Sequence, residues 1–110
     1  MDIFFDDKKF EQNCNSHTKL VRKYGLQMAK VLGRRLDEIR AAKNLEVVRA
    51  FGRCHELHGD RKGQFSMDLV HPQRLIFTAA EDPPPRKTDG GLNWSLITSV
   101  VILGIHDTHE

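Results

Sequence analysis

The chain has 110 residues, of which 39% are hydrophobic and 29% are charged, and its formal net charge is +2. This length predicts one domain with one hydrophobic core across residues 1–110, and the composition is ordinary for a globular protein. The charge balance excludes a bulk polycation, and the longest apolar-rich run, residues 96–105, is far shorter than the ~20 residues that span a bilayer.

The first half of the chain reads as one strand followed by helices. Residues 2–5 resemble a short strand, and residues 7–13 are helix-prone. Asn15 or Ser16 is suited to cap a second helix that ends near Tyr24, where Gly25 follows. A third helix is the clearest, because its apolar residues recur at helical spacing: Met28, Leu32, Leu36 and Ile39. Asn44 is then placed to cap a short helix through Ala50.

Basic residues dominate the stretch between His17 and Lys43, where the only acidic residues are Asp37 and Glu38. The basic residues are Lys19, Arg22, Lys23, Lys30, Arg34, Arg35, Arg40 and Lys43. A basic helical face favours a polyanionic partner, and nucleic acid is the first candidate. An ordinary solvated helix surface produces the same charge pattern, so both interpretations stay open.

Residues 53–77 predict three short strands separated by turns at 59–63 and 70–73. Glycines flank the first turn, and the second contains a proline, which cannot donate to a strand ladder. Hydrophobic residues alternate with polar ones in the strands after each turn: Phe65, Met67, Leu69, Leu75 and Phe77. This part of the chain therefore predicts an antiparallel sheet.

A proline-rich loop over residues 81–91 leads to the last strand. Three consecutive prolines stiffen the loop, and Trp94 is expected to anchor the return. Residues 97–105 are rich in β-branched side chains on both alternating positions, as in a central strand that is covered on both faces. Together the elements predict an α+β fold.

Nothing in the sequence indicates export. The N-terminus lacks the basic and apolar regions of a signal peptide, and two cysteines, Cys14 and Cys54, are too few for a disulfide framework. We therefore expect a cytoplasmic protein with no membrane association.

Several site chemistries are disfavoured by the residue spacing. No Walker-type loop or dinucleotide fingerprint is present. Cys54 and His55 are neighbours on a predicted strand and so point to opposite faces, which disfavours a nucleophile–base pair and makes Cys54 a small core residue. The pairs His55/His58 and His106/His109 are three residues apart and diverge on a strand, so we predict neither a metal nor a cofactor.

Metal-independent RNA cleavage fits the polar residues better. Attack by a ribose 2′-OH on the adjacent phosphate needs a base near neutral pKa, cations for the phosphorane and an acid for the leaving oxygen. Histidine and arginine supply these groups at pH 7. We expect His55, Arg74, Asp107 and His109 to converge if the last strand pairs beside the middle strands. Each histidine alone is equally well explained as a surface residue.

The residues carry a resemblance to a known family. Residues 53–66, the later Gln-Arg-Leu-Ile-Phe of residues 73–77 and the terminal Asp-Thr-His resemble the HigB-type toxins of the RelE/ParE superfamily, the killer proteins of bacterial toxin–antitoxin modules. The match covers nearly the whole chain in order. It implies a RelE/ParE-like, microbial-RNase-like fold, in which an N-terminal strand and a helical hairpin pack on an antiparallel β-sheet.

The resemblance also implies a function. Members of the family cleave mRNA in the ribosomal A site, and a small helix-turn-helix antitoxin neutralises them. For this chain the resemblance implies a HigA-like antitoxin. It also implies that the toxin contacts operator DNA only through that antitoxin. By position, His55 matches a catalytic histidine and Arg74 a phosphate-contacting arginine. Asp107 and His109 match the carboxylate and the histidine of a terminal Asp-Tyr-His.

Two positions depart from the family pattern, and four residues complete the predicted site. Thr108 stands where the family has a tyrosine that stacks on a base, and His58 stands where lysine is common. We expect Arg61 and Lys62 to grip the rRNA or mRNA backbone. His58 and Arg53 complete the expected RNA-binding set.

Two alternatives remain open at this stage. A ParE-like gyrase poison shares the fold but needs none of these histidines. A non-catalytic toxin homologue would act only through antitoxin binding and operon control.

Overall fold

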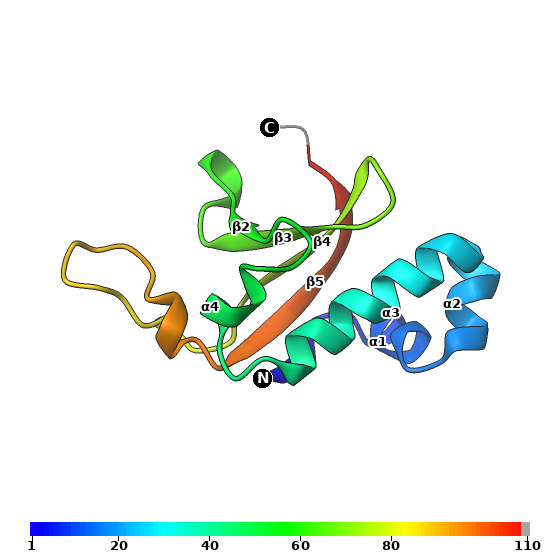
Figure 1. Cartoon of the computed structure of the whole chain (residues 1–110), viewed down its shortest axis with the longest axis horizontal. Coiled ribbons are helices and arrows are strands. Elements are labelled where there is room, and N and C mark those ends of the chain that lie inside the picture. Colours follow the sequence, from blue (N-terminus) through cyan, green and yellow to red (C-terminus); the bar gives the residue numbers. More distant parts are fainter. Residues whose placement is uncertain (109–110) are drawn as a thin grey trace.

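The computed structural model describes residues 1–108, and Figure 1 shows helices packed beside a twisted sheet. The helices are α1 (Lys8–Cys14), α2 (His17–Tyr24), α3 (Leu26–Ala41) and α4 (Leu45–Val48). The strands are β1 (Asp2–Phe5), β2 (His55–Glu56), β3 (Gln64–Asp68), β4 (Gln73–Ala79) and β5 (Ser99–Asp107), with short 3₁₀ turns η1 (Gly59–Arg61) and η2 (Trp94–Leu96). Of the helices in residues 1–108, none combines the length and the apolarity needed to cross a membrane.

Side-chain caps explain where the helices begin. The Asp7 carboxylate accepts hydrogen bonds from two backbone N–H groups of the first turn of α1. The Ser16 hydroxyl, and not Asn15, accepts the N–H of Lys19 at the start of α2, and the Asn44 side chain caps α4. Such caps satisfy N–H groups that have no partner within the helix. The predicted α4 was too long, since it ends at Val48.

The strands form one sheet in the order β1-β5-β4-β3-β2. Neighbouring strands are antiparallel except β1 and β5, which run parallel. The predicted last strand is flanked on both sides, because β5 lies between β1 and β4, but it runs from Ser99 to Asp107 and not over residues 97–105. The α+β fold with an N-terminal strand, a helical hairpin of α2 and α3, and a sheet is confirmed, with one parallel pair added to the expected antiparallel sheet.

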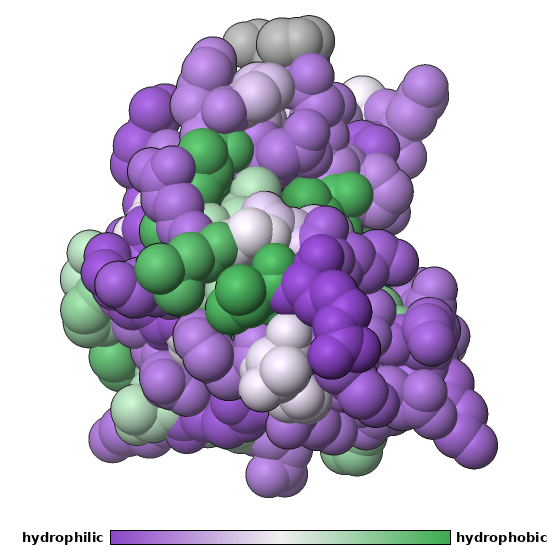
Figure 2. Space-filling model, turned by 90° about the vertical axis from the view of Figure 1, so that its right-hand side faces the viewer, coloured by the Kyte–Doolittle hydropathy of each residue, from purple (hydrophilic) through white to green (hydrophobic). Residues whose placement is uncertain are grey.

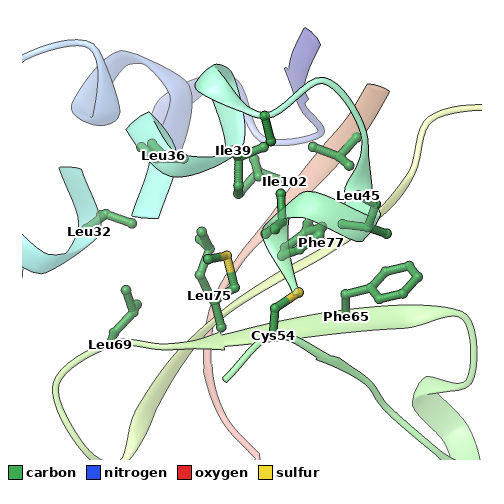
Figure 3. Close-up of a cluster of buried hydrophobic side chains, with 14 of the residues drawn as sticks. Leu32, Leu36, Ile39, Leu45, Cys54, Phe65, Leu69, Leu75, Phe77 and Ile102 are labelled. Carbon is green, nitrogen blue, oxygen red and sulfur yellow. The ribbon is translucent and has the colours of Figure 1, made fainter. Parts of the chain in front are cut away.

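The main core lies between α3 and one face of the sheet. Figure 3 shows Leu32, Leu36 and Ile39 of α3 pointing toward Leu75 and Phe77 of β4, and all five side chains are buried. Helical spacing in α3 and alternation in the strands place these residues on facing surfaces. The second face of the sheet is free of α3 and carries the polar residues described below.

A β-bulge in β5 decides which residues reach that second face. Phe77 pairs with Ile102 but the preceding Ile76 pairs with Gly104, so Leu103 is an extra residue with no partner on β4. An extra residue reverses the alternation of the side chains that follow it. Consequently Ile102 faces the core, whereas Gly104 and His106 face the second side of the sheet.

Trp94 anchors the return from the proline-rich loop, as predicted. It is buried in η2, its ring meets Phe65 edge-on at a centroid distance of 4.8 Å, and the Arg49 guanidinium lies 3.8 Å from its centroid. These contacts join the loop to α4 and β3.

Candidate active site

The second face of the sheet gathers His55, Arg74 and His106 from three different strands. Arg74 lies opposite Asp68 of β3 on one side and opposite His106 of β5 on the other. His55 of β2 lies opposite Ser66, two residues before Asp68. Directly opposed residues in an antiparallel pair share a face, so the register alone brings these polar side chains to one surface.

Arg74 is held by two oxygen atoms. Its Nε lies 3.5 Å from Oδ1 of Asp68, and its Nη1 donates a hydrogen bond to Oγ1 of Thr108 at 3.3 Å. Only 21% of the Arg74 side chain is exposed. The guanidinium is therefore oriented by the protein while part of it still reaches the surface.

Arg53 joins Arg74 at the same carboxylate. Its Nη1 lies 3.6 Å from Oδ2 of Asp68, although the side chain itself is 76% exposed. Among residues 1–108, Arg53 is the only non-glycine residue with positive φ, at +52°. Backbone strain of this kind is concentrated at functional sites. A small cavity of about 140 Å³ lies beside both arginines and is lined also by Asp68, His71 and Gln73, so two guanidiniums outnumber one carboxylate around a space that suits an anionic group.

The backbone around Arg53 also sets the tautomer of His55. Nδ1 of His55 lies 2.8 Å from the carbonyl oxygen of Arg53. Since a carbonyl oxygen can only accept, Nδ1 carries the proton in this contact. In the neutral ring Nε2 is then the nitrogen with the lone pair, which is the atom needed by a general base.

His106 is a site candidate that the sequence analysis missed. The imidazole of His106 lies over Gly104 on the second face. A Cβ added to Gly104 would be 3.6 Å from Nε2 of His106. In the sequence, His106 stands out only as half of the His106/His109 pair with metal-ligand spacing. Gly104 inside the apolar strand pattern was the one sequence signal for a bulge that would redirect His106, whereas its position beside Arg74 follows from the strand register.

The other C-terminal candidates lie in different positions. Asp107 is exposed and pairs with Gln73, one residue away from the Arg74–His106 pair, so alternation directs it to the opposite face. His109 lies outside the described residues. Thr108 is buried against Arg74 and not presented for stacking.

The predicted RNA-binding residues of the first turn lie beside β2 and β3. His58 and Lys62 flank η1 and are exposed, while Arg61 is half-buried and donates from Nη1 to Oε1 of Gln64 at 3.3 Å. Arg53 is separate from this turn and belongs to the Arg74 group. The structure thus divides the four predicted RNA-binding residues into two places.

Most of the predicted basic face of the helices is exposed, with one exception. Figure 2, which views the side of the molecule where α2 lies, shows mainly hydrophilic surface around a few hydrophobic patches. Arg35 is the exception, because its Nη1 pairs with Glu38 at 2.8 Å and its Nε donates to the carbonyl oxygen of Asp68 at 2.8 Å. It links α3 to the candidate site and is not part of the basic surface.

Cys54 is a core residue, as predicted. It is buried, and burial raises the pKa of its thiol from 9.0 to about 12, so the nucleophilic thiolate is suppressed.

Within residues 1–108, no three His, Cys, Asp or Glu side chains gather to hold a metal ion. A groove of about 790 Å³ lies between α3 and the segment from Val47 to Phe51, and none of the candidate-site residues His55, Arg74 and His106 lines it.

Comparisons with solved structures show which proteins share this fold. No protein-family model matches the chain, and no curated protein sequence matches it. Solved structures do match along the whole length. The YoeB–YefM complex from Staphylococcus aureus gives a TM-score of 0.58 at 19% identity, covering 100% of this chain and 98% of that chain. A YoeB dimer from the same organism gives 0.55 at 20% identity, with the same coverages.

A third match comes from another organism. The YoeB/ParE toxin from Agrobacterium tumefaciens gives a TM-score of 0.56 at 9% identity, covering 99% of this chain and 100% of that chain. At these identities the comparisons show that the fold is shared. The chain therefore has the α+β fold of YoeB and ParE toxins.

Proposed function

We propose that this chain is the toxin of a type II toxin–antitoxin module and acts as a ribosome-dependent, metal-independent mRNA endonuclease of the HigB type. The observation that carries the proposal is the convergence of His55, Arg74 and His106 on one face of the sheet. Imidazoles and a guanidinium are the groups that 2′-OH attack on a phosphodiester requires. The fold shared with YoeB toxins supports the same assignment.

Each residue has a proposed role. Arg74 stabilises the negative charge of the phosphorane, because its planar guanidinium offers several donors in a fixed geometry. His55 is the general base through Nε2, and His106 or His109 protonates the leaving 5′-oxygen. The sequence resemblance gives Asp107 the role of orienting an imidazole or acting as a base, and because Asp107 faces the opposite side of the sheet here, this role requires the end of β5 to change its alignment on the ribosome.

The remaining basic residues bind the RNA backbone. Arg53 lies beside Arg74 and takes a phosphate next to the cleaved one, while Arg61, Lys62 and His58 grip the rRNA or mRNA from the η1 turn. Phosphate contacts of this kind fix the position of the strand without reading its sequence. The candidate site has few cations on an open surface, so we infer that the ribosome supplies the rest of the substrate alignment.

The proposed partner is a helix-turn-helix antitoxin, through which the toxin also reaches operator DNA. Two of the solved structures that share this fold are described as complexes of YoeB with YefM, one of them as a heterotetrameric toxin–antitoxin complex. They support an antitoxin as a partner, and the HigA-like class is the proposal that follows from the sequence resemblance. We place the protein in the cytoplasm, where its translated substrate is.

The test is cleavage of a labelled mRNA on programmed ribosomes by the purified chain, compared with the same mRNA free in solution. We expect cuts within codons of the translated mRNA and none in naked mRNA, and we expect Arg74→Ala to abolish them. Arg86→Ala is the matched control, since Arg86 is exposed in the proline-rich loop and its Nη1 donates to the Gly90 carbonyl oxygen at 2.8 Å.

Two other outcomes would identify the alternatives. Inhibition of gyrase supercoiling without any mRNA cleavage would point to a gyrase poison. Antitoxin binding without growth arrest, cleavage or gyrase inhibition would point to a non-catalytic homologue. Equal cutting of naked and translated mRNA would contradict ribosome dependence.

A further inference from the structure

We propose that Asp68 and Thr108 are positioning residues that fix the guanidinium of Arg74 in one orientation before the substrate arrives. Neither residue touches the substrate in this proposal. The inference rests on the proposed function, because it concerns the arginine assigned to the phosphate. It gives Thr108 a role different from that of the stacking tyrosine found at this position in the family that the sequence resembles.

Hydrogen bonds on both sides hold the backbone of Asp68 in place. Its backbone N–H donates to the carbonyl oxygen of Gly52 at 2.8 Å, and its carbonyl oxygen accepts from Nε of Arg35 at 2.8 Å. The carboxylate between these two anchors lies 3.5 Å from Arg74 Nε and 3.6 Å from Arg53 Nη1. One carboxylate thereby offsets the repulsion between two neighbouring guanidiniums and holds both beside the small cavity.

Thr108 holds the other side of the guanidinium. It is only 7% exposed, and its hydroxyl oxygen accepts a hydrogen bond from Arg74 Nη1 at 3.3 Å. A buried hydroxyl is normally satisfied by such a partner. Because Thr108 follows directly after β5, it links the orientation of Arg74 to the end of the central strand.

The two contacts leave a defined part of Arg74 for the substrate. Nε forms an ion pair with Asp68, Nη1 donates to Thr108, and the hydrogen bonds among residues 1–108 do not include Nη2. Without these contacts the flexible side chain of Arg74 would have to be ordered during the reaction. Misalignment of the guanidinium with the phosphate by even a small distance lowers the cleavage rate strongly. The structure thus assigns Nη2 as the donor for the phosphate and the other two nitrogens as its supports.

The test compares substitutions that keep the shape but remove one contact. Thr108→Val keeps the branched side chain without the hydroxyl, and Thr108→Ser keeps the hydroxyl. We expect Thr108→Val and Asp68→Asn to lower kcat for mRNA cleavage on programmed ribosomes by about 10²-fold with KM nearly unchanged. Thr108→Ser should retain activity within about threefold of the wild type. Thr98→Val, at an exposed threonine just before β5, is the matched control and should leave kcat unchanged.

A second measurement separates this inference from the proposed function. In the wild-type protein the Arg74 Nε–H should give a sharp, slowly exchanging NMR signal, and that signal should broaden in Asp68→Asn and Thr108→Val. If the wild-type chain cuts no mRNA, the proposed function fails, but the NMR signal still tests the positioning. An unchanged signal in both variants, or wild-type kcat in Thr108→Val, would overturn the inference.

Discussion

His106 lies directly opposite Arg74 in the antiparallel pair of β4 and β5, so the imidazole and the guanidinium share the second face of the sheet. If catalysis occurs on this face, His106→Gln should lower the rate of mRNA cleavage by about 10²-fold or more, the usual loss when a general acid or base is removed. Asp107→Asn should cost less, because Asp107 alternates to the other face. Single-turnover cleavage on programmed ribosomes measures both.

The control for this comparison is His17→Gln, at an exposed histidine at the start of α2. It should leave the cleavage rate unchanged, since His17 lines the groove between α3 and the segment from Val47 to Phe51, and none of the candidate-site residues lines that groove. A larger loss in Asp107→Asn than in His106→Gln would show that the end of β5 changes its alignment on the ribosome.

The difference between His106 and Asp107 shows what the sequence could not reveal. Strict alternation from Val100 and Ile102, which both face the core, would also place residue 106 on the core side. The bulge at Leu103 reverses that alternation; the neighbouring Gly104 is compatible with a bulge, but it does not fix the pairing partner of each residue. The strand itself was predictable from its apolar residues, but the face presented by its last residues depends on pairing with β4.

Local signals, by contrast, predicted much of the helical half correctly. Ser16 and Asn44 cap α2 and α4 through contacts within a few residues, and the apolar spacing of α3 directly reflects its buried side. Arg35 was assigned to the basic surface, although it pairs inward with Asp68 of β3. The contact joins residues 33 positions apart in the sequence, so only the folded chain could show it.

Gly33 predicts a stabilising substitution. It lies inside α3, and an added Cβ would meet no other atom within 4 Å. Alanine is favoured over glycine in a helix interior by about 1 kcal/mol, so Gly33→Ala should raise the free energy of unfolding by about that amount. Urea denaturation monitored by circular dichroism measures the change. A loss of stability would contradict the open surroundings of Gly33.

The two cysteines should be unreactive in the folded protein. Burial raises the pKa of both thiols from 9.0 to about 12, so little thiolate exists at pH 8. We expect iodoacetamide to label neither Cys14 nor Cys54 in the native chain, and both after unfolding in urea. Mass spectrometry of the tryptic peptides distinguishes the two sites, and rapid native labelling of Cys54 would contradict its burial.

The same pKa shifts predict how stability depends on pH. The folded pKa lies above the unfolded value, so the unfolded state loses its thiol protons first as pH rises. The free energy of unfolding should therefore fall from about pH 9 upward through the folded pKa. A Cys14→Ala, Cys54→Ala double variant, measured by urea denaturation at pH 8 and pH 10, should lose less stability across this range than the wild type.

The last prediction concerns the turn that brings Arg53 to the site. Gly52 has φ of +56°, and a Cβ there would lie 2.6 Å from Nε of Arg35, the group that donates to Asp68. Gly59→Ala is the matched control, because Gly59 has φ of +64° but open space around the added Cβ. Backbone strain alone should cost about 1–2 kcal/mol in Gly59→Ala. Gly52→Ala should cost roughly 1.5–3 kcal/mol more, since displacing Arg35 breaks a charged hydrogen bond. Urea denaturation gives both values, and equal losses would show that Arg35 moves aside without cost.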